Sequence, residues 1–241
     1  MRKNIILLSI GIIAVACTNM TEPEMPVSGT YMTFGARVQE HVSTRTMLQK
    51  DLSVAWEKGD AVAVFDDECR NWTMSDMKIH PGDPRLAYFS GECKSGSAWW
   101  YGVYPASAAE GIDDDGKMTV VLPSQQNARA GSFAADMNLA VAYTRNAEDG
   151  LNFKNVCGLL AVAVKNDGIR KIELKAAEKS SGALCGTAVV SMEAAGAPQV
   201  EAVTSAEGSV VLSGDFEKGK TYYMTVFPGA FDINFGSFAT H

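Results

Sequence analysis

The sequence has few histidines, no long basic runs and none of the common catalytic or nucleotide-binding motifs. Its three histidines, His41, His80 and His241, are isolated, so none has the spacing of a metal-ligand pair. The patterns G-x-S-x-G, G-x-G-x-x-G and the P-loop are also absent. The formal net charge is −7, and no run of Lys or Arg exceeds two residues, as in Arg170-Lys171. We therefore expect no enzyme, no metal or cofactor site and no nucleic-acid partner.

No C-x-x-C pair occurs among the five cysteines, which excludes a zinc ribbon and a thioredoxin-like motif. Apart from Cys17, they are Cys69, Cys93, Cys157 and Cys185. In an oxidising compartment they could form disulfides, most simply Cys69 with Cys93 and Cys157 with Cys185. The alternative is four small buried thiols. The spacing leaves both open.

No segment after the N-terminus keeps a helical stripe for three turns, and the apolar period is two. Short apolar runs separated by Gly, Asp, Asn and Pro predict an all-β protein made of antiparallel β-sandwiches. The candidate strands cover residues 31–34, 53–56, 61–65, 98–104, 118–122, 139–143, 158–165, 171–175, 187–192, 199–203, 209–212 and 221–227.

The strand count predicts two domains that meet near Asn166. Residues 30–166 supply about seven strands, which is enough for one sandwich. Residues 167–241 supply about five and end in an apolar run, 231–241, for which the pattern offers no partner. We therefore expect the second sandwich to be incomplete, either because the reading frame is truncated or because a partner completes it.

The N-terminus has the pattern of a secretory signal. Arg2 and Lys3 precede twelve mostly apolar residues, whereas a membrane-spanning helix needs about twenty. The run ends in Ala14-Val15-Ala16-Cys17, which resembles the lipobox of bacterial lipoproteins. The resemblance implies cleavage before Cys17 and acylation of its thiol, which anchors the product to a membrane. Residues 18–29, with two prolines, are expected to be a flexible tether.

Two further clusters each have two interpretations. The acidic residues 113–115 fit a calcium loop poorly, because an EF-hand-like frame would place Gly111 and Leu122 at ligand positions. We expect a solvated hairpin tip there and at residues 66–68. The run Trp99-Trp100-Tyr101 could form a sugar-binding platform, but alternation puts Trp100 on the opposite face from its neighbours, which favours core packing.

A succession of short motifs resembles a known family. In chain order they are Arg45-Thr46, Trp56-Glu57-Lys58-Gly59-Asp60, Tyr104-Pro105-Ala106-Ser107, Leu122-Pro123-Ser124-Gln125-Gln126, Asn138 to Ala142, Phe153 to Leu160, and Tyr222 to Gly229. Over about residues 30–235 this order is similar to the fimbrillin-like lipoproteins of Bacteroidetes, the fimbrial subunits and their anchor and tip relatives. The resemblance implies two transthyretin-like β-sandwich domains and a structural, adhesive or anchor subunit of a fimbria.

The resemblance also implies assembly by donor-strand exchange with other fimbrial subunits. An arginine-specific protease would remove the lipidated leader together with the first strand, and a strand from the next subunit would fill the groove. Arg45 is the preferred cleavage site and Arg37 the second; alternatively, both are surface arginines of a protein that keeps its lipid. The expected location is the cell outer membrane, or the fimbrium after processing, with a host or bacterial surface ligand as a further partner. The alternative function is a monomeric glycan-binding surface lipoprotein.

Overall fold

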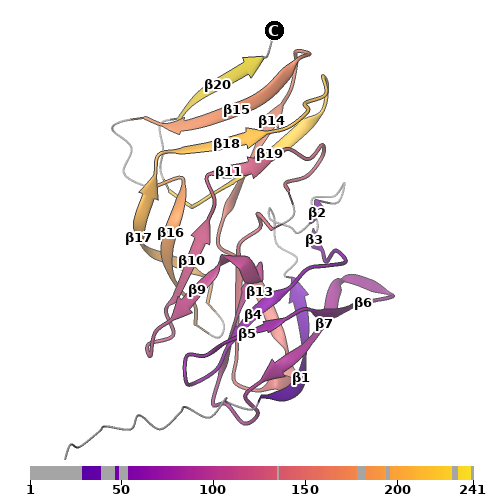
Figure 1. Ribbon diagram of the computed structural model, residues 1–241, viewed down its shortest axis with the longest axis vertical. Coiled ribbons are helices and arrows are strands. Elements are labelled where there is room, and N and C mark those ends of the chain that lie inside the picture. The colour runs from indigo at the N-terminus through magenta and orange to yellow at the C-terminus, as the bar shows by residue number, and fades with distance from the viewer. Residues whose placement is uncertain are drawn as a thin grey trace, which may run out of the picture.

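The computed structural model describes residues 29–38, 47–48, 54–134, 136–177, 183–193, 196–229 and 233–239 (Figure 1). Within these ranges the chain forms twenty β-strands and two short 3₁₀ helices, and no α-helix. The predicted all-β class is confirmed. No helix of the described ranges is long and apolar enough to cross a membrane. The predicted signal peptide, Cys17, residues 18–28 of the predicted tether and Arg45 lie outside the described residues.

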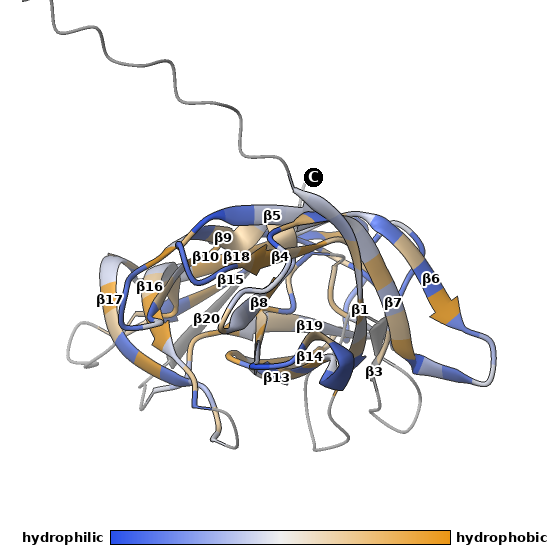
Figure 2. Ribbon diagram, turned by 90° about the horizontal axis from the view of Figure 1, so that it is seen from below, coloured by the Kyte–Doolittle hydropathy of each residue, from blue (hydrophilic) through white to orange (hydrophobic). Residues whose placement is uncertain are grey.

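Eight strands form one sheet that nearly closes on itself (Figure 1 and Figure 2). In the order in which they pair, they are β5 (Asn71–Met74), β4 (Val62–Phe65), β8 (Trp100–Tyr104), β12 (Ala140–Thr144), β13 (Leu151–Asn155), β1 (Thr30–Val38), β7 (Asp83–Cys93) and β6 (Asp76–His80). Only Ser75 separates β5 from β6, so one extended segment supplies both edges. This barrel-like sheet differs from the face-to-face sandwich predicted for this part of the chain.

Gly91 in β7 allows β5, at one edge of the sheet, to lie close to β7, the strand beside the other edge. A Cβ at this position would lie 2.9 Å from the carbonyl oxygen of Thr73 and 2.9 Å from the sulfur of Met74, both in β5. Any side chain would therefore force β7 away from β5.

The other strands belong to smaller sheets. One has the order β17 (Gln199–Glu207), β16 (Cys185–Ser191), β10 (Met118–Leu122) and β9 (Ala109–Ile112); another has β11 (Gln125–Asn127), β18 (Ser209–Ser213), β15 (Ile169–Ala176) and β20 (Ile233–Ala239). β14 (Gly158–Ala163) pairs with β19 (Thr221–Val226), and β2 (Met47–Leu48) with β3 (Val54–Ala55). The 3₁₀ helices are η1 (Ala106–Ala108) and η2 (Ala147–Asp149).

Strand pairing crosses the domain boundary predicted at residue 166. β10 pairs with β16, β11 with β18, and β14 with β19. The sheets therefore do not divide where the sequence divides, because strands on both sides of residue 166 complete the same sheets. β20 comes from the apolar run at residues 231–241 and pairs with β15. The described pairings are antiparallel except for β1 with β13 and β11 with β18, which are parallel. These two exceptions correct the expectation of wholly antiparallel sheets.

The core consists of two hydrophobic clusters that share three strands. Alternate residues of β4 face opposite ways, so that Val62 and Val64 join the cluster inside the barrel-like sheet while Ala63 and Phe65 join the other. β8 and β12 are divided between the clusters in the same manner. Because both faces of β4 are buried, its sequence is a continuous apolar run.

Candidate functional site at strand β1

Strand β1 lies between β7 and β13 in the barrel-like sheet. It pairs antiparallel with β7 from Thr30 to Arg37 and parallel with β13 from Ala36 to Val38. Phe34, Ala36 and Val38 point into the barrel and are 0–3% exposed. β1 therefore closes the barrel core with three alternate apolar side chains, as period-two patterning requires.

Trp56 contacts β1 from inside the barrel core. Its indole Nε1 donates a hydrogen bond of 3.0 Å to the carbonyl oxygen of Ala36. The ring makes edge contacts with Phe89 of β7 at 4.9 Å and Phe153 of β13 at 5.6 Å between centroids. Trp56 thus contacts β1 and both of its neighbours. The small side chain of Ala36 belongs to the same buried cluster as Trp56.

Polar contacts on the outer face tie β1 to the β6–β7 hairpin. The Tyr31 hydroxyl donates to Asp76 at 2.7 Å, Thr33 and Ser90 share a hydrogen bond of 2.8 Å, and Arg37 forms an ion pair of 2.7 Å with Asp83. Such exposed pairs each contribute at most about 1 kcal/mol. Their main effect is to favour one register of β1.

A glycine lets β13 approach β1 closely. Gly150, directly before β13, has φ 70° and faces the backbone of Gly35. A Cβ at residue 150 would clash with the Gly35 carbonyl oxygen, and the positive φ would also strain it. The parallel contact between β1 and β13 therefore depends on this glycine.

The turn that carries Trp56 is stabilised by the buried Asp60. Its carboxylate accepts hydrogen bonds from the Tyr104 hydroxyl at 2.9 Å and the Glu57 N–H at 2.7 Å. Glu57 in turn binds Arg129 through two hydrogen bonds of 2.7 and 2.8 Å. Burial raises the pKa of Asp60 to about 6, despite the hydrogen bonds that favour its charged form.

The raised pKa of Asp60 predicts a pH-dependent stability. The folded protein binds this proton more tightly than the unfolded chain, so the contribution of Asp60 to stability is greatest below pH 4 and is lost as the pH rises through about 6. Between pH 4 and pH 7, the free energy of unfolding should fall by about 2 kcal/mol more in the wild type than in Asp60→Asn. Lys94 lowers the pKa of Asp67 to about 2, and Arg37 lowers that of Asp83 to about 2. Both groups are present in the two proteins, so their contributions to the pH dependence cancel in this comparison. Urea unfolding of both proteins at a series of pH values measures this difference. If the free energy of unfolding depended on pH in the same way in both, the raised pKa of Asp60 would be contradicted.

Of the two predicted cleavage sites, the structure describes Arg37 alone. Arg37 is in the middle of a paired region, opposite Leu86 of β7 and Asn152 of β13. A protease that binds its substrate as an extended strand reaches this bond only after β1 separates from its neighbours.

The four other cysteines are free thiols. Cys93, Cys157 and Cys185 are buried, as the buried-thiol alternative predicts, and Cys69 is half-buried. Burial raises the pKa of Cys93 to about 11 and that of Cys185 to about 12, and it raises the pKa of Cys157 further in the same direction. Neither of the suggested disulfides, Cys69 with Cys93 or Cys157 with Cys185, is present.

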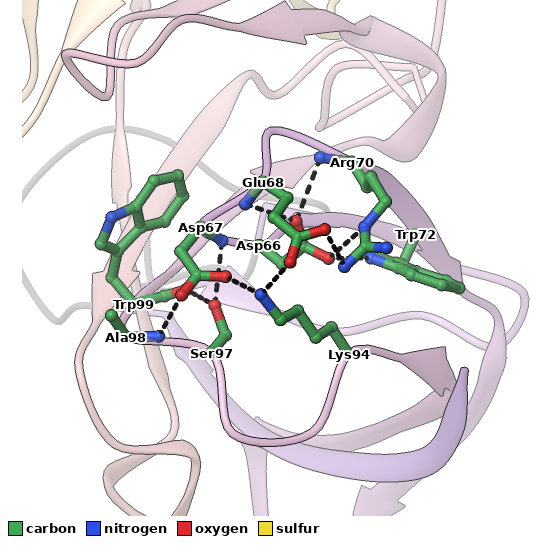
Figure 3. A network of polar contacts seen from close by, with 9 residues as sticks. All are labelled: Asp66, Asp67, Glu68, Arg70, Trp72, Lys94, Ser97, Ala98 and Trp99. Atoms are coloured by element: carbon green, nitrogen blue, oxygen red, sulfur yellow. Dashed lines mark hydrogen bonds and ion pairs between the residues drawn. The ribbon is translucent and has the colours of Figure 1, made fainter. Parts of the chain in front are cut away.

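The acidic turn at residues 66–68 is a structural network and not a solvated tip (Figure 3). The Asp66 side chain is fully buried and accepts hydrogen bonds from Arg70 at 3.0 Å and the Trp72 indole at 2.8 Å. Burial alone would raise its pKa, but these hydrogen bonds outweigh burial and hold the pKa below the ordinary value. Lys94 bridges Asp67 and Glu68. The described residues contain no group of three or more His, Cys, Asp or Glu side chains placed to hold a metal.

The predicted alternation of the aromatic run is observed. Trp100 is 4% exposed and lies in the barrel core, whereas Trp99 and Tyr101 are half-buried on the opposite face. Trp99 and Trp100 therefore do not form a common platform.

Sequence reasoning missed the partners of three buried polar residues: Asp60 with Tyr104, Asp66 with Trp72, and Gln126 with Thr225. The motif Trp56-Glu57-Lys58-Gly59-Asp60 contains Asp60 but gives no indication of its partner.

Comparison with known proteins gives no relative: no family model, no curated protein and no solved structure matches this chain.

Proposed function

We propose that this protein is a fimbrillin-like surface lipoprotein, anchored by an acylated Cys17, that assembles into a fimbria by exchange of β1. Within the all-β class, the proposal assigns the chain two transthyretin-like sandwich domains. The observation that carries the proposal is the setting of β1. It is the first strand of the described chain, it lies between two neighbours, and it fills the barrel core with the alternate side chains of Phe34, Ala36 and Val38, beside the partly buried Met32.

Removal of the predicted leader would remove β1 as well. A cut after Arg45 separates residues 30–38 from everything that follows, because β1 precedes the cut. The loss would expose the ring of Trp56, the inner faces of β7 and β13, and a row of backbone groups on each. Such a groove binds an extended strand through main-chain hydrogen bonds and pockets for alternate side chains.

The sequence of β20 supports a copy of this chain as the donor. Phe235-Gly236-Ser237-Phe238-Ala239 repeats the pattern of Phe34-Gly35-Ala36-Arg37-Val38: Phe, Gly, a small residue, any residue, and a smaller apolar residue. β20 is also an edge strand, with β15 as its only partner among the described residues. In the proposed assembly, β20 of one subunit fills the groove that β1 leaves in the next.

The test is the mass and oligomeric state of the full-length lipoprotein before and after digestion with an arginine-specific protease. We expect loss of the leader at Arg45, followed by SDS-resistant ladders of regular spacing. Arg45→Ala should abolish both, whereas Arg37→Ala should leave both intact. An added peptide with the sequence of residues 30–38 should suppress the ladders. A protein that keeps its lipid, or that loses the leader and stays monomeric, would refute the proposal.

A further inference from the structure

A groove of about 700 Å³ lies on the face of β8 and β12 that points away from the barrel core. One wall carries Tyr101 of β8 and Tyr143 of β12. The other is built from the turn at residues 115–117, the end of β16, and Glu201 of β17. The groove is thus bounded by the barrel-like sheet and by the sheet that contains β16 and β17, the juncture where ligand pockets often lie.

The aromatic wall follows from strand register. Tyr101 and Tyr143 are directly opposite each other on neighbouring strands, and their ring centroids are 4.6 Å apart. Trp99, two residues before Tyr101 and on the same face, extends the row with a centroid distance of 5.1 Å. Gly116 permits this arrangement, since a Cβ there would lie 2.5 Å from the Tyr101 hydroxyl. The result is a row of three half-buried rings.

The polar wall offers both donors and acceptors. Arg145 donates from Nε to the Tyr143 hydroxyl at 2.7 Å, which leaves its terminal N–H groups without a partner among the described residues. Lys117 and Glu201 form an ion pair of 2.7 Å within this wall. The carboxylates of Asp115 and Glu193 also line it and have no side-chain partner in the described part of the chain.

This combination matches the chemistry of a neutral sugar. Aromatic rings pack against the C–H faces of a pyranose, while free carboxylates and guanidinium N–H groups bind its hydroxyls, which both donate and accept. Three carboxylates and two cations give no positive excess to attract a phosphate or a polyanion. We propose that this groove binds a neutral oligosaccharide, with Tyr101 and Tyr143 as the stacking residues and Arg145, Asp115 and Glu193 as hydroxyl ligands. The proposal does not depend on strand exchange.

The test begins with the unprocessed protein on an array of neutral and acidic oligosaccharides, followed by titration calorimetry with the best neutral binder. Tyr143→Ala and Arg145→Ala should each weaken binding about tenfold or more, which corresponds to about 1.4 kcal/mol. The control is Tyr88→Ala, because Tyr88 is an exposed aromatic residue on β7 and outside the groove. Its affinity should equal that of the wild type.

Arg145→Ala changes an exposed side chain and should leave the fold intact, so it keeps the test valid if Tyr143→Ala unfolds. Binding of acidic glycans only, no binding on the array, or unchanged affinity in Arg145→Ala would each overturn the proposal.

Discussion

Replacing Gln126 with leucine is expected to lower the free energy of unfolding by about 3 kcal/mol. Gln126 of β11 is 2% exposed, and its amide bonds to Thr225 of β19 in the manner of a strand ladder. Nε2 donates to the Thr225 carbonyl oxygen at 2.9 Å and to its hydroxyl at 3.0 Å, while Oε1 accepts from the Thr225 N–H at 3.0 Å. Leucine has a similar volume but leaves these buried groups of Thr225 unpaired.

Urea unfolding of the wild type and two variants measures this effect. Gln125→Leu is the matched control, because Gln125 is the exposed neighbour in the same strand. Its unfolding free energy should stay within about 0.5 kcal/mol of the wild type. Equal urea midpoints for Gln126→Leu and Gln125→Leu would show that the hydrogen bonds between Gln126 and Thr225 contribute nothing to stability.

Replacing Trp56 with alanine should cost about 4 kcal/mol, the range for a buried tryptophan. The loss combines a cavity under β1 with the missing hydrogen bond to Ala36 and three edge-on ring contacts, to Phe89, Tyr104 and Phe153. We also expect the bond after Arg37 to become sensitive to an arginine-specific protease under native conditions, because β1 loses its anchor.

Two further variants complete this experiment. Trp56→Phe keeps most of the ring volume but loses the N–H donor, so a cost of about 1 kcal/mol is expected together with a smaller gain in cleavage at Arg37. Trp99→Ala removes a half-buried tryptophan outside the barrel core and should leave cleavage at Arg37 unchanged. If Trp99→Ala accelerated that cleavage as much as Trp56→Ala, Trp56 would not be the anchor of β1.

Period-two patterning predicted strands well where a single apolar run stands out from the sequence around it. The runs at residues 61–65, 98–104 and 221–227 correspond to β4, β8 and β19 with small shifts of their ends. β7, the longest strand, was missed because Tyr88 beside Phe89 and the glycine at 91 obscure the alternation of its inward residues. β13 was missed because a single Leu-x-Phe pair carries its pattern.

Long-range partners could not be predicted from the same patterns. A two-residue period shows which face of a strand is buried, but not which strand lies opposite. Gln126 and Thr225 are 99 residues apart, and nothing in either local sequence identifies the other. The same limit explains why the strand count did not indicate that strands from before and after residue 166 share sheets. Trp56 was recognised as part of a motif, yet its contact with Ala36 depends on the closure of the barrel.

The division of β4, β8 and β12 between the two clusters has a consequence for cooperativity. These strands form a single layer of sheet that both clusters share, with one cluster packed on each of its faces. Suppose that one cluster unfolded while the other stayed packed and kept β4 in place. The β4 side chains that belong to the unfolded cluster, either Val62 and Val64 or Ala63 and Phe65, would then become exposed to water. The cost of that exposure couples the two halves, so the described part of the chain is expected to melt as one thermodynamic unit despite its several separate sheets.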